Sequence, residues 1–396
     1  MTEQAKVPAI RFAGFTDPWE QRKLGELFEE SDERASDREI LSVSVANGIY
    51  PASESDRETN PGASLANYKI VHFGDVVYNS MRMWQGAVDA SRYDGIVSPA
   101  YVVARPNSEV YARFFARLLR QPMLLKQYQQ VSQGNSKDTQ VLKFDDFASI
   151  GISMPASENE QRRIGGFFDR LDSLITLHQR KYDKLVIFKK SMLEKMFPKD
   201  GESVPEIRFA GFTDPWEQRK ASEVFQIVDD RGHPTLPVLS ATQNQGMIYR
   251  DDSGRYIGHD ESNEIGYKRV LPGDFVVHLR SFQGGFAHSQ YEGITSPAYT
   301  VFRAKEPTSH SDRFWKHWFM SEHFIAGLST VTYGIRDGRS ISVDEFMNTF
   351  LAFPAVEEQA AISRLFDYLD DLITLHQRKL ELLQNIKKSL LDKMFA

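Results

Sequence analysis

Three loops in each half of the chain carry side chains that suit the reading of DNA base edges. Arginine donates two hydrogen bonds to guanine, asparagine and glutamine pair with adenine, and serine and threonine serve either base. The candidate DNA-binding residues are Asn47, Asn79, Ser80, Arg82, Gln85, Asn135, Ser136, Lys137, Gln140, Gln243, Asn244, His278, Arg280, Ser281, Gln283, Tyr333, Arg336 and Arg339.

Comparing the loop at 79–86 with its counterpart at 278–284 separates these candidates into two groups. Arg82 and Gln85 recur in the second copy, which indicates phosphate contact or a framework role, while the positions beside them differ and suit base selection. An ordinary solvated turn is the alternative for each loop. Trp84 matches Phe282 in the other copy, and we expect this position to lie in the core rather than to stack on bases.

Catalytic motifs are missing from the sequence. It contains no G-x-x-x-x-G-K-[ST] phosphate loop, no H-E-x-x-H helix and no G-x-S-x-G elbow. An Asn/Asp-Pro-Pro-aromatic segment, of the kind that amino-methylating enzymes use to hold a flipped base, is also absent. The chain has no cysteine, which excludes disulfides and thiolate metal sites. We therefore predict a non-catalytic chain that binds no metal and no cofactor of its own.

The charge balance limits how the chain would bind DNA. Its formal net charge is −6, whereas a protein that grips DNA alone is usually basic, because neutralising phosphates releases counterions. The sequence therefore predicts a local DNA contact inside a larger assembly.

The elements that must position these loops occur twice. Residues 10–23 are repeated without change at 207–220, and the block LITLHQRK at 174–181 returns at 372–379. The period of about 198 residues exceeds the ~20–50 residues of a solenoid unit, so each unit has the size of a domain plus a long helix. Two similar units approximate a two-fold axis, which is also a symmetry of B-DNA.

Each unit has the same order of expected elements. The block Pro18–Lys23 looks like the start of a short amphipathic helix. Runs of β-branched and aromatic residues at 74–78 and 95–103 predict strands, and residues 109–131 predict a helix. A last strand ends at Met154. Strands and helices that do not alternate regularly indicate an α+β fold.

A long helix follows the last strand of each unit. Ser157 and Glu160 form an S-x-x-E capping box. Apolar residues then recur in alternating steps of three and four, with a histidine and a lysine at matching steps, as expected of a coiled coil of ~60 Å. We predict that the two helices pair antiparallel, with one globular domain at each end. The seam residues are Ile164, Phe168, Leu171, Ile175, Tyr182, Leu185, Met192 and Met196, and Ile362, Phe366, Leu369, Ile373, Leu380, Leu383, Leu390 and Met394, with His178, Lys189, His376 and Lys387 as the polar steps.

These parts together resemble the specificity subunit of type I restriction-modification systems. The resemblance spans nearly the whole chain and depends on the order of its motifs. The carrying residues are Pro155, Glu160, Gln161 and Ile164, their counterparts Pro354, Glu358, Gln359 and Ile362, the LITLHQRK helices, and the Phe-x-Gly-Phe-x-x-x-Trp-Glu-x-x-Lys starts.

The resemblance implies a division of labour. Target recognition domains at 1–155 and 205–354 would each read half of a split, asymmetric DNA site. Conserved helices at 156–197 and 355–396, with a linker at 198–204, would set the gap between the half-sites. The helices would also dock two methyltransferase subunits that use S-adenosylmethionine, and restriction subunits that use ATP and Mg would join them. The candidate coiled-coil and docking residues are Gln161, Ile164, Phe168, Leu171, Ile175, His178, Arg180, Leu185, Gln359, Ile362, Phe366, Leu369, Ile373, His376, Arg378 and Leu383.

Two other readings of the sequence stay open. One is a self-contained DNA-modifying enzyme, and the other is a duplicated scaffold that binds two protein ligands. The N-terminal residues carry no apolar run typical of a signal peptide, and no stretch approaches the ~18 apolar residues of a membrane span. We expect a cytoplasmic protein.

Overall fold

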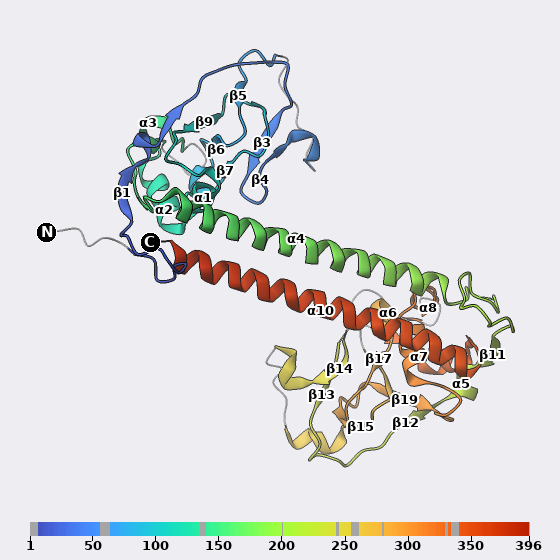
Figure 1. Cartoon of the computed structure of the whole chain (residues 1–396). Helices are drawn as coiled ribbons and strands as arrows, with labels where there is room; N and C mark the ends of the chain where they lie inside the picture. Colours follow the sequence, from blue (N-terminus) through green and yellow to red (C-terminus); the bar gives the residue numbers. More distant parts are fainter. Residues whose placement is uncertain are drawn as a thin grey trace. The chain divides into compact units, whose positions relative to one another are not determined.

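The chain folds as two compact units in a computed structural model (Figure 1). Unit 1 comprises 1–179 and 378–396, and unit 2 comprises 180–377. The described residues are 7–55, 64–134, 140–199, 201–242, 245–254, 261–278, 281–328, 332–333 and 340–395. The expected separation into recognition domains and helical regions differs from this partition, since each unit contains a part of both long helices.

Unit 1 is built on a four-stranded antiparallel sheet in the order β2-β9-β6-β7, with the smaller antiparallel pairs β3-β4, β5-β8 and β1-β10. Its elements are β1 (Glu20–Lys23), η1 (Leu24–Glu26), β2 (Phe28–Glu30), β3 (Leu41–Ser44), β4 (Gly48–Pro51), η2 (Ala52–Glu54), β5 (Lys69–Val71), β6 (Val76–Asn79), η3 (Met83–Gln85), β7 (Val88–Ala90), β8 (Gly95–Val97), β9 (Tyr101–Pro106), α1 (Ala112–Leu118), α2 (Pro122–Val131), α3 (Phe144–Ala148) and β10 (Gly151–Met154).

Unit 2 repeats this topology with the sheet β12-β19-β16-β17 and the pairs β13-β14, β15-β18 and β11-β22, and it has the further pair β20-β21. Its elements are β11 (Glu217–Lys220), α5 (Ala221–Val224), β12 (Phe225–Val228), β13 (Leu239–Thr242), β14 (Gly246–Tyr249), η4 (Arg250–Ser253), η5 (Glu261–Gly266), β15 (Lys268–Val270), β16 (Phe275–Val277), α6 (Ser281–Gly284), β17 (Ala287–His288), β18 (Gly293–Thr295), β19 (Thr300–Ala304), α7 (Asp312–Trp318), α8 (Glu322–Gly327), β20 (Thr332–Tyr333), β21 (Ser340–Ile341), α9 (Val343–Asn348) and β22 (Phe350–Phe353). The mixed α+β class is confirmed.

The repeated Pro-Trp-Glu-Gln-Arg-Lys block forms a strand, so the predicted helix start is wrong. In unit 1 this strand, β1, pairs antiparallel with β10, with Glu20 opposite Met154 and Lys23 opposite Gly151. Strand β11 pairs in the same way with β22. The long-range pairing satisfies the backbone of four polar residues whose local sequence favours a helix just as well, so tertiary context decides.

The predicted helix at 109–131 is two helices. α1 ends at Leu118 and α2 begins at Pro122. Proline has no backbone N–H to donate and its ring clashes with the preceding turn, so it begins a new helix rather than continuing the old one. The strand predicted at 95–103 is likewise divided into β8 and β9 by the turn at Ser98–Ala100.

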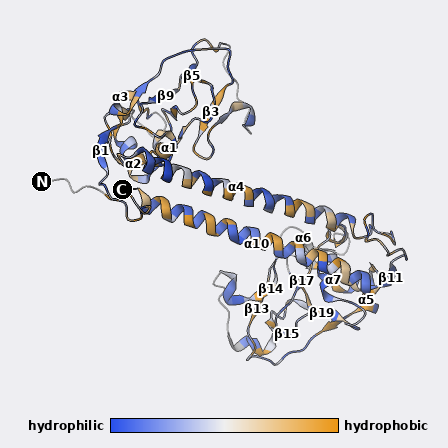
Figure 2. Cartoon of the chain, viewed as in Figure 1, coloured by the Kyte–Doolittle hydropathy of each residue, from blue (hydrophilic) through white to orange (hydrophobic). Residues whose placement is uncertain are grey.

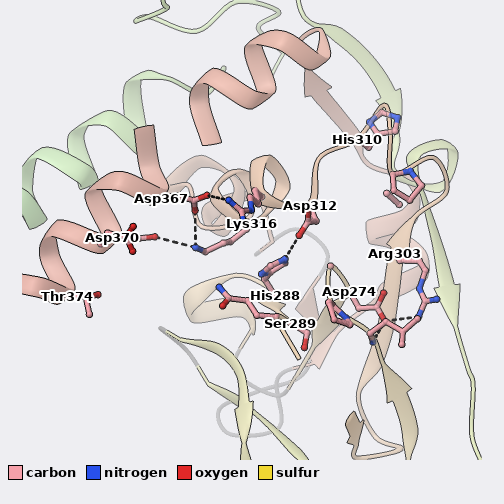
Figure 3. Close-up of a pocket in the computed structure, with 18 residues that line it drawn as sticks. Asp274, His288, Ser289, Arg303, His310, Asp312, Lys316, Asp367, Asp370 and Thr374 are labelled. Atoms are coloured by element: carbon pink, nitrogen blue, oxygen red, sulfur yellow. Dashed lines mark hydrogen bonds and ion pairs between the residues drawn. The ribbon is translucent and has the colours of Figure 1, made fainter. Parts of the chain in front are cut away.

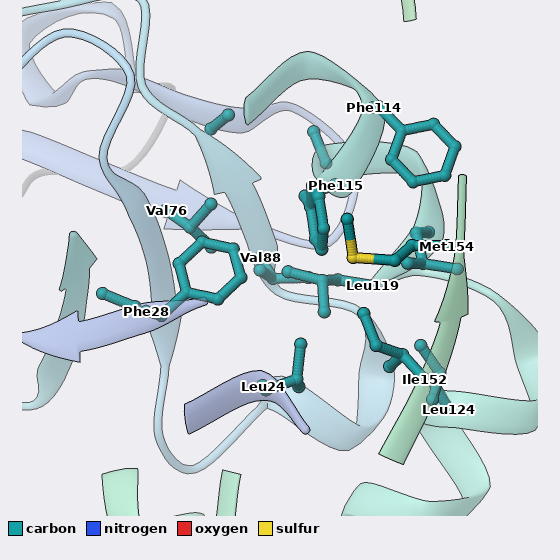
Figure 4. Close-up of a cluster of buried hydrophobic side chains, with 14 of the residues drawn as sticks. Leu24, Phe28, Val76, Val88, Phe114, Phe115, Leu119, Leu124, Ile152 and Met154 are labelled. Atoms are coloured by element: carbon teal, nitrogen blue, oxygen red, sulfur yellow. The ribbon is translucent and has the colours of Figure 1, made fainter. Parts of the chain in front are cut away.

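The core of unit 1 lies between its main sheet and α1 (Figure 4). Val76 and Val88 extend from the sheet toward Phe115 and Leu119, and Ile152 and Met154 of β10 close one side (Figure 4). Rings at this centre meet edge to face, as Phe28 and Phe115 do at a centroid distance of 5.3 Å.

Two long helices pass through both units. α4 spans Glu158–Lys195 and α10 spans Val356–Met394. Figure 2 shows apolar and polar residues alternating along both helices, and the predicted seam residues are buried or half-buried. Ser157 and Glu160 do not form the predicted reciprocal capping box, because the Glu160 carboxylate binds Arg11.

The helices run antiparallel within each unit. In unit 1 the Phe168 ring lies 6.0 Å from that of Phe395, and Asp172 binds Lys387 at 2.6 Å. Residue numbers therefore rise along α4 as they fall along α10. Unit 2 shows the same order, because Lys189 binds Asp370 and the Phe197 ring stacks on Phe366.

Each long helix ends in the core of the unit built by the other repeat. Phe395, just after α10, stacks on Phe114 of unit 1 at a centroid distance of 5.4 Å. Phe197, just after α4, contacts Phe314 of unit 2 at 5.7 Å. Ile10 N–H also donates to the Lys393 carbonyl at 3.0 Å. Each core is therefore completed by the end of the long helix that belongs to the other repeat.

Among the helices in the described part of the chain, none is long and apolar enough to span a membrane.

Candidate functional site

Two of the predicted loops of unit 1 meet at Ser80. The Ser80 hydroxyl donates to the Ala100 carbonyl at 2.8 Å, and the Ser80 carbonyl accepts from Leu142 N–H at 2.8 Å. The segment after β6 therefore lies against the β8–β9 turn and against the end of the 133–141 loop. Gly86, at φ +93°, closes η3 in a conformation that favours glycine and returns the chain to β7.

The side chains of this loop face different surroundings. Asn79 Oδ1 accepts from Met81 N–H at 3.0 Å, so the amide shapes the turn. Arg82 and Gln85 are exposed, and within the described ranges no carboxylate pairs with the Arg82 guanidinium. Trp84 packs against the core, as predicted. Gln140 is half-buried, and its Oε1 has no hydrogen-bond partner among the residues described.

Asn47 lies apart from these contacts. It is exposed on the turn between β3 and β4, where its N–H donates to Ser44 Oγ at 3.0 Å. The Ser44 carbonyl in turn accepts from Arg120 Nη2 at 3.5 Å, which ties this turn to the α1–α2 junction.

The matching loop of unit 2 is only partly described. Ser281 is fully buried and its Oγ accepts from His278 N–H at 2.9 Å, so its position argues against a base contact. His278 is half-buried, with its ring 6.2 Å from that of Tyr299, and Gln283 is exposed. Tyr333 is described in its backbone alone, as a residue of β20. The candidates outside the described residues are Asn135, Ser136, Lys137, Gln243, Asn244, Arg280, Arg336 and Arg339.

The Glu-Gln pair at the start of each long helix holds the helix to its unit. Glu160 is 1% exposed and receives two hydrogen bonds from Arg11, at 2.6 and 2.7 Å. Gln161 Oε1 accepts from Tyr111 N–H at 2.8 Å, and its Nε2 donates to the Pro155 carbonyl. These bonds explain why Glu-Gln recurs beside an identical N-terminal block.

Glu358 and Gln359 repeat these contacts in unit 2. Arg208 donates to Glu358 at 2.7 and 2.8 Å, and Gln359 Oε1 accepts from Ser311 N–H at 3.0 Å. Gln161 and Gln359 are both buried, which argues against the docking role that the sequence suggested for them.

A cluster of ion pairs joins α4 to the globular part of unit 1. Arg113 and Arg117 of α1 donate to Asp169 at 2.8 and 2.9 Å. Arg117 also binds Asp172 at 2.6 Å. Burial alone would raise the pKa of Asp169, but the hydrogen bond from Arg113 and the surrounding arginine charges lower it. We call Asp169, Asp172 and their partners the unit 1 junction.

The unit 2 junction joins α7 to the acid pair Asp367 and Asp370 of α10 (Figure 3). Lys316 of α7 lies 3.5 Å from Asp367 and 3.4 Å from Asp370, and Figure 3 shows it between the two carboxylates. His317 Nε2 lies 3.1 Å from Asp367. Nearby, His288 pairs with Asp312 at 2.8 Å.

A hollow of about 840 Å³ lies beside the unit 2 junction. Among its lining residues is Gln290, at the position that Arg92 occupies in unit 1, where Arg92 binds Asp169 at 3.1 Å. His317 likewise occupies the place of Arg117. Two positions that hold arginine in unit 1 therefore hold shorter side chains in unit 2.

The pKa values of His317 and Asp367 in the unit 2 junction are both lowered, for different reasons. Burial lowers the pKa of His317, because an uncharged imidazole is favoured away from water. Burial would raise the pKa of Asp367, but the hydrogen bond with His317 and the charges of Lys316 and Arg313 outweigh it and lower the pKa to about 2.

His317, Asp367 and Asp370 have metal-ligand atoms within 4.8 Å of one another. The ammonium groups of Lys316 and Lys189 already contact these carboxylates. The positive charge that a metal ion would supply is therefore provided by the chain itself.

The predicted docking residues separate into inner and outer positions. Ile164, Phe168 and Leu171 are buried in unit 1, so their place is the seam. Arg180 and Arg378 are exposed on the outer faces of the helices. The residues of the same pattern that are buried or half-buried are Ile175, His178, Leu185, Ile362, Phe366, Leu369, Ile373, His376 and Leu383.

The repeated LITLHQRK segment also exposes leucines to solvent. Leu177 is 47% exposed and its counterpart Leu375 is 45% exposed.

The acid pairs of the junctions were missed at the level of sequence. The signal was present, since the pattern Asp-x-x-Asp at 169–172 returns at 367–370 on the same face as the seam. Two aspartates at this spacing on a charged helix are equally consistent with a solvated surface. Only the partners on α1 and α7 show that these aspartates form ion pairs.

The first half of the chain matches a known protein family. Residues 16–186 match the family described as "Type I restriction modification DNA specificity domain".

Two curated relatives come from Methanocaldococcus jannaschii. One, the type I restriction enzyme MjaVIII specificity subunit, is 24% identical over 62% of this chain, and the match spans 61% of that relative's length. The other, the putative type I restriction enzyme MjaX specificity subunit, is 19% identical over 83% of this chain and 79% of its own length.

A solved structure shares the fold. The S subunit of a type I restriction-modification system from M. genitalium superposes with a TM-score of 0.56 at 11% identity, with 99% of each chain covered.

Proposed function

We infer that this chain, which carries a type I restriction modification DNA specificity domain at residues 16–186, is a specificity subunit that reads a bipartite, asymmetric DNA sequence. The family match carries this proposal. The structure supports its extension to the second half, because unit 2 repeats the strand order of unit 1.

The internal comparison favours two different half-sites. The elements shared by both units are the strands, the Glu-Gln attachments and the helix junctions. The loop after β6 and its counterpart differ in residue type, with Asn79 and Ser80 in unit 1 and His278 and Ser281 in unit 2. A common frame with different loops suits two readers of different sequences.

The two long helices would set the distance between the half-sites, with one recognition domain toward each end. Their antiparallel order within each unit supports this arrangement. The outer faces of the identical LITLHQRK segments, with Arg180, Arg378 and the exposed leucines, would dock two copies of a methyltransferase subunit. Matching surfaces are what two identical partners require.

The chemistry would belong to the partner subunits in the cytoplasm. S-adenosylmethionine would be held by the methyltransferase subunits, and ATP with Mg by restriction subunits. The chain itself would contribute DNA selection and no catalytic group.

The proposal is tested with the assembled complex. The complex with methyltransferase subunits should shift a DNA duplex selectively and should methylate adenines at one bipartite sequence, with affinity falling steeply as salt rises. Omitting this chain should abolish the sequence selectivity, and persistence of selectivity without it would exclude the proposal.

A second measurement addresses the enzyme alternative. The purified chain alone should transfer no label from S-adenosylmethionine to DNA. Turnover by the chain alone would favour a self-contained enzyme, and a complex that binds proteins but no particular DNA would favour the scaffold.

A further inference from the structure

Asp172 and Asp370 occupy equivalent places on the two long helices, and each joins three elements. Asp172 of α4 accepts from Arg117 of α1 through Oδ2 at 2.6 Å. Its other oxygen, Oδ1, accepts from Lys387 of α10 at 2.6 Å. One carboxylate thus connects the globular part of unit 1 with both long helices.

Asp370 makes the same connection in unit 2. Its Oδ1 accepts from Lys189 of α4 at 2.5 Å, and its Oδ2 lies 3.4 Å from Lys316 Nζ of α7. Lys189 and Lys387 are charged residues at positions of the otherwise apolar seam. Each ammonium group is paired with the aspartate of the opposite helix, Lys189 with Asp370 and Lys387 with Asp172.

The neighbouring aspartates provide an internal comparison. Among the residues described, Asp169 forms ion pairs with the globular part alone, through Arg92, Arg113 and Arg117. Asp367 likewise binds Arg313, Lys316 and His317. Within each acid pair, one residue attaches the globular part to its own helix, and the other also links it to the opposite helix.

These ion pairs lie where solvent screens charges incompletely. The side chain of Arg117 is 11% exposed and that of Asp172 is 28% exposed. Charge-assisted hydrogen bonds at such sites are short and directional, so they favour one relative orientation of the groups that they join.

We propose that Asp172 and Asp370 are positioning residues that fix the orientation of each recognition domain on the paired long helices. The role of this orientation in DNA reading rests on the proposed function, since a domain turned on its helices presents its loops to a groove at another angle. The contacts of the two units differ in length. Those of α1 with the acid pair of unit 1 measure 2.6–2.9 Å, while those of α7 with the acid pair of unit 2 measure 3.1–3.5 Å.

The absence of cysteine permits a direct test in the full-length chain. Spin labels at Glu54→Cys and Leu382→Cys, both exposed positions of unit 1, report the distance between the globular part and α10, the opposite long helix. We expect a narrow distance distribution in the parent chain. It should broaden in Asp172→Asn and in Lys387→Met and narrow again in Asp172→Glu.

The matched control is Asp169→Asn, which removes a carboxylate of the same helix face without breaking the link to α10. It should lower the melting temperature and leave the distance distribution narrower than in Asp172→Asn. Lys387→Met should add nothing in an Asp172→Asn background, because both substitutions break one contact. An unchanged distribution in folded Asp172→Asn, or equal broadening by Asp169→Asn, would overturn the proposal.

Labels at Asp251→Cys and Ile187→Cys make the same measurement in unit 2, between its globular part and α4. We expect a broader distribution there than in unit 1, and further broadening by Asp370→Asn. Methylation by the complex separates the two proposals. If Asp172→Asn methylates less efficiently but at the same recognition sequence, the result supports the positioning role. A parent complex without sequence selectivity would defeat the proposed function while leaving the distance result intact.

Discussion

Gly165 lies where α4 passes closest to α1. A Cβ at this position would lie 2.9 Å from the Phe114 backbone nitrogen, whereas a Cβ on Gly166 meets nothing within 4 Å. We expect Gly165→Ala to lower the free energy of unfolding by about 1–3 kcal/mol through overpacking. Gly166→Ala should raise it by up to ~1 kcal/mol, because alanine favours the helix. Denaturant titration of the full chain measures both, and equal effects would refute the close approach.

His317 makes the stability of unit 2 depend on pH. Its folded-state pKa is lowered by burial, so the unfolded state binds a proton more readily. Stability is therefore full above the unfolded pKa of ~6.5 and falls as pH drops through that value. The facing charges are Lys316, Asp367, Asp370 and Lys189.

His317→Gln should flatten the loss of thermal stability between pH 7.5 and about 5, since glutamine does not titrate. A profile that stays steep in His317→Gln would assign the acid sensitivity to other groups. Asp367, with its pKa of about 2, contributes stability above its unfolded value of 3.8 and loses it as pH falls toward 2.

At the scale of elements, the end of each long helix packs in the core built by the other repeat. Truncating a ring at either end should therefore destabilise the unit in which that ring packs. Phe395 packs among Trp19, Phe114 and Phe168. We expect Phe395→Ala to destabilise unit 1 by about 3–5 kcal/mol, as truncation of a buried ring does. Phe197→Ala should destabilise unit 2 in the same way.

Hydrogen exchange resolved by peptide distinguishes the two variants. Phe395→Ala should remove protection from α1, and Phe197→Ala should remove it from α7. Phe188→Ala is the matched control, because that ring is 46% exposed on α4 and should change stability by less than about 0.5 kcal/mol. Loss of protection in the same unit by both core variants would contradict the packing of each helix end in the core of the other repeat.

The long helices were the elements most predictable from sequence, while the repeated N-terminal block was the least. Over α4 and α10 the apolar spacing alone identifies the helices and their seam. The block at 20–23 is too short for its periodicity to separate helix from strand, and its partner β10 lies about 130 residues away. Local propensity carries no information about such a pairing.

At the scale of the whole molecule, the proposed function predicts separable half-sites. Replacing residues 205–354 by another recognition domain should change one half of the methylated sequence and leave the other half as it was. Methylome sequencing of cells that express the exchanged chain measures this. A change in both halves would defeat the division of labour.

The proposed spacing role predicts a change in the gap. One heptad inserted in both long helices preserves the apolar stripe and adds ~10 Å to each. We expect the non-specific gap to lengthen by ~3 base pairs, or methylation to be lost because the half-sites no longer align. If the complex stays active and the gap is unchanged, the long helices do not set the length of the gap. Insertion in one helix alone is the control, and it should break the pairing.

The sequence by itself determined the duplication, the α+β class, the two long helices and their seam, because repeats and periodicity are properties of residue order. The tertiary structure alone decided which parts form a unit. The helix ends join the cores of opposite repeats, Glu160 binds Arg11, and Asp172 binds both Arg117 and Lys387. These contacts join residues that are distant in the chain, and a charged side chain on a helix reads as solvated until the folded chain brings its partner beside it.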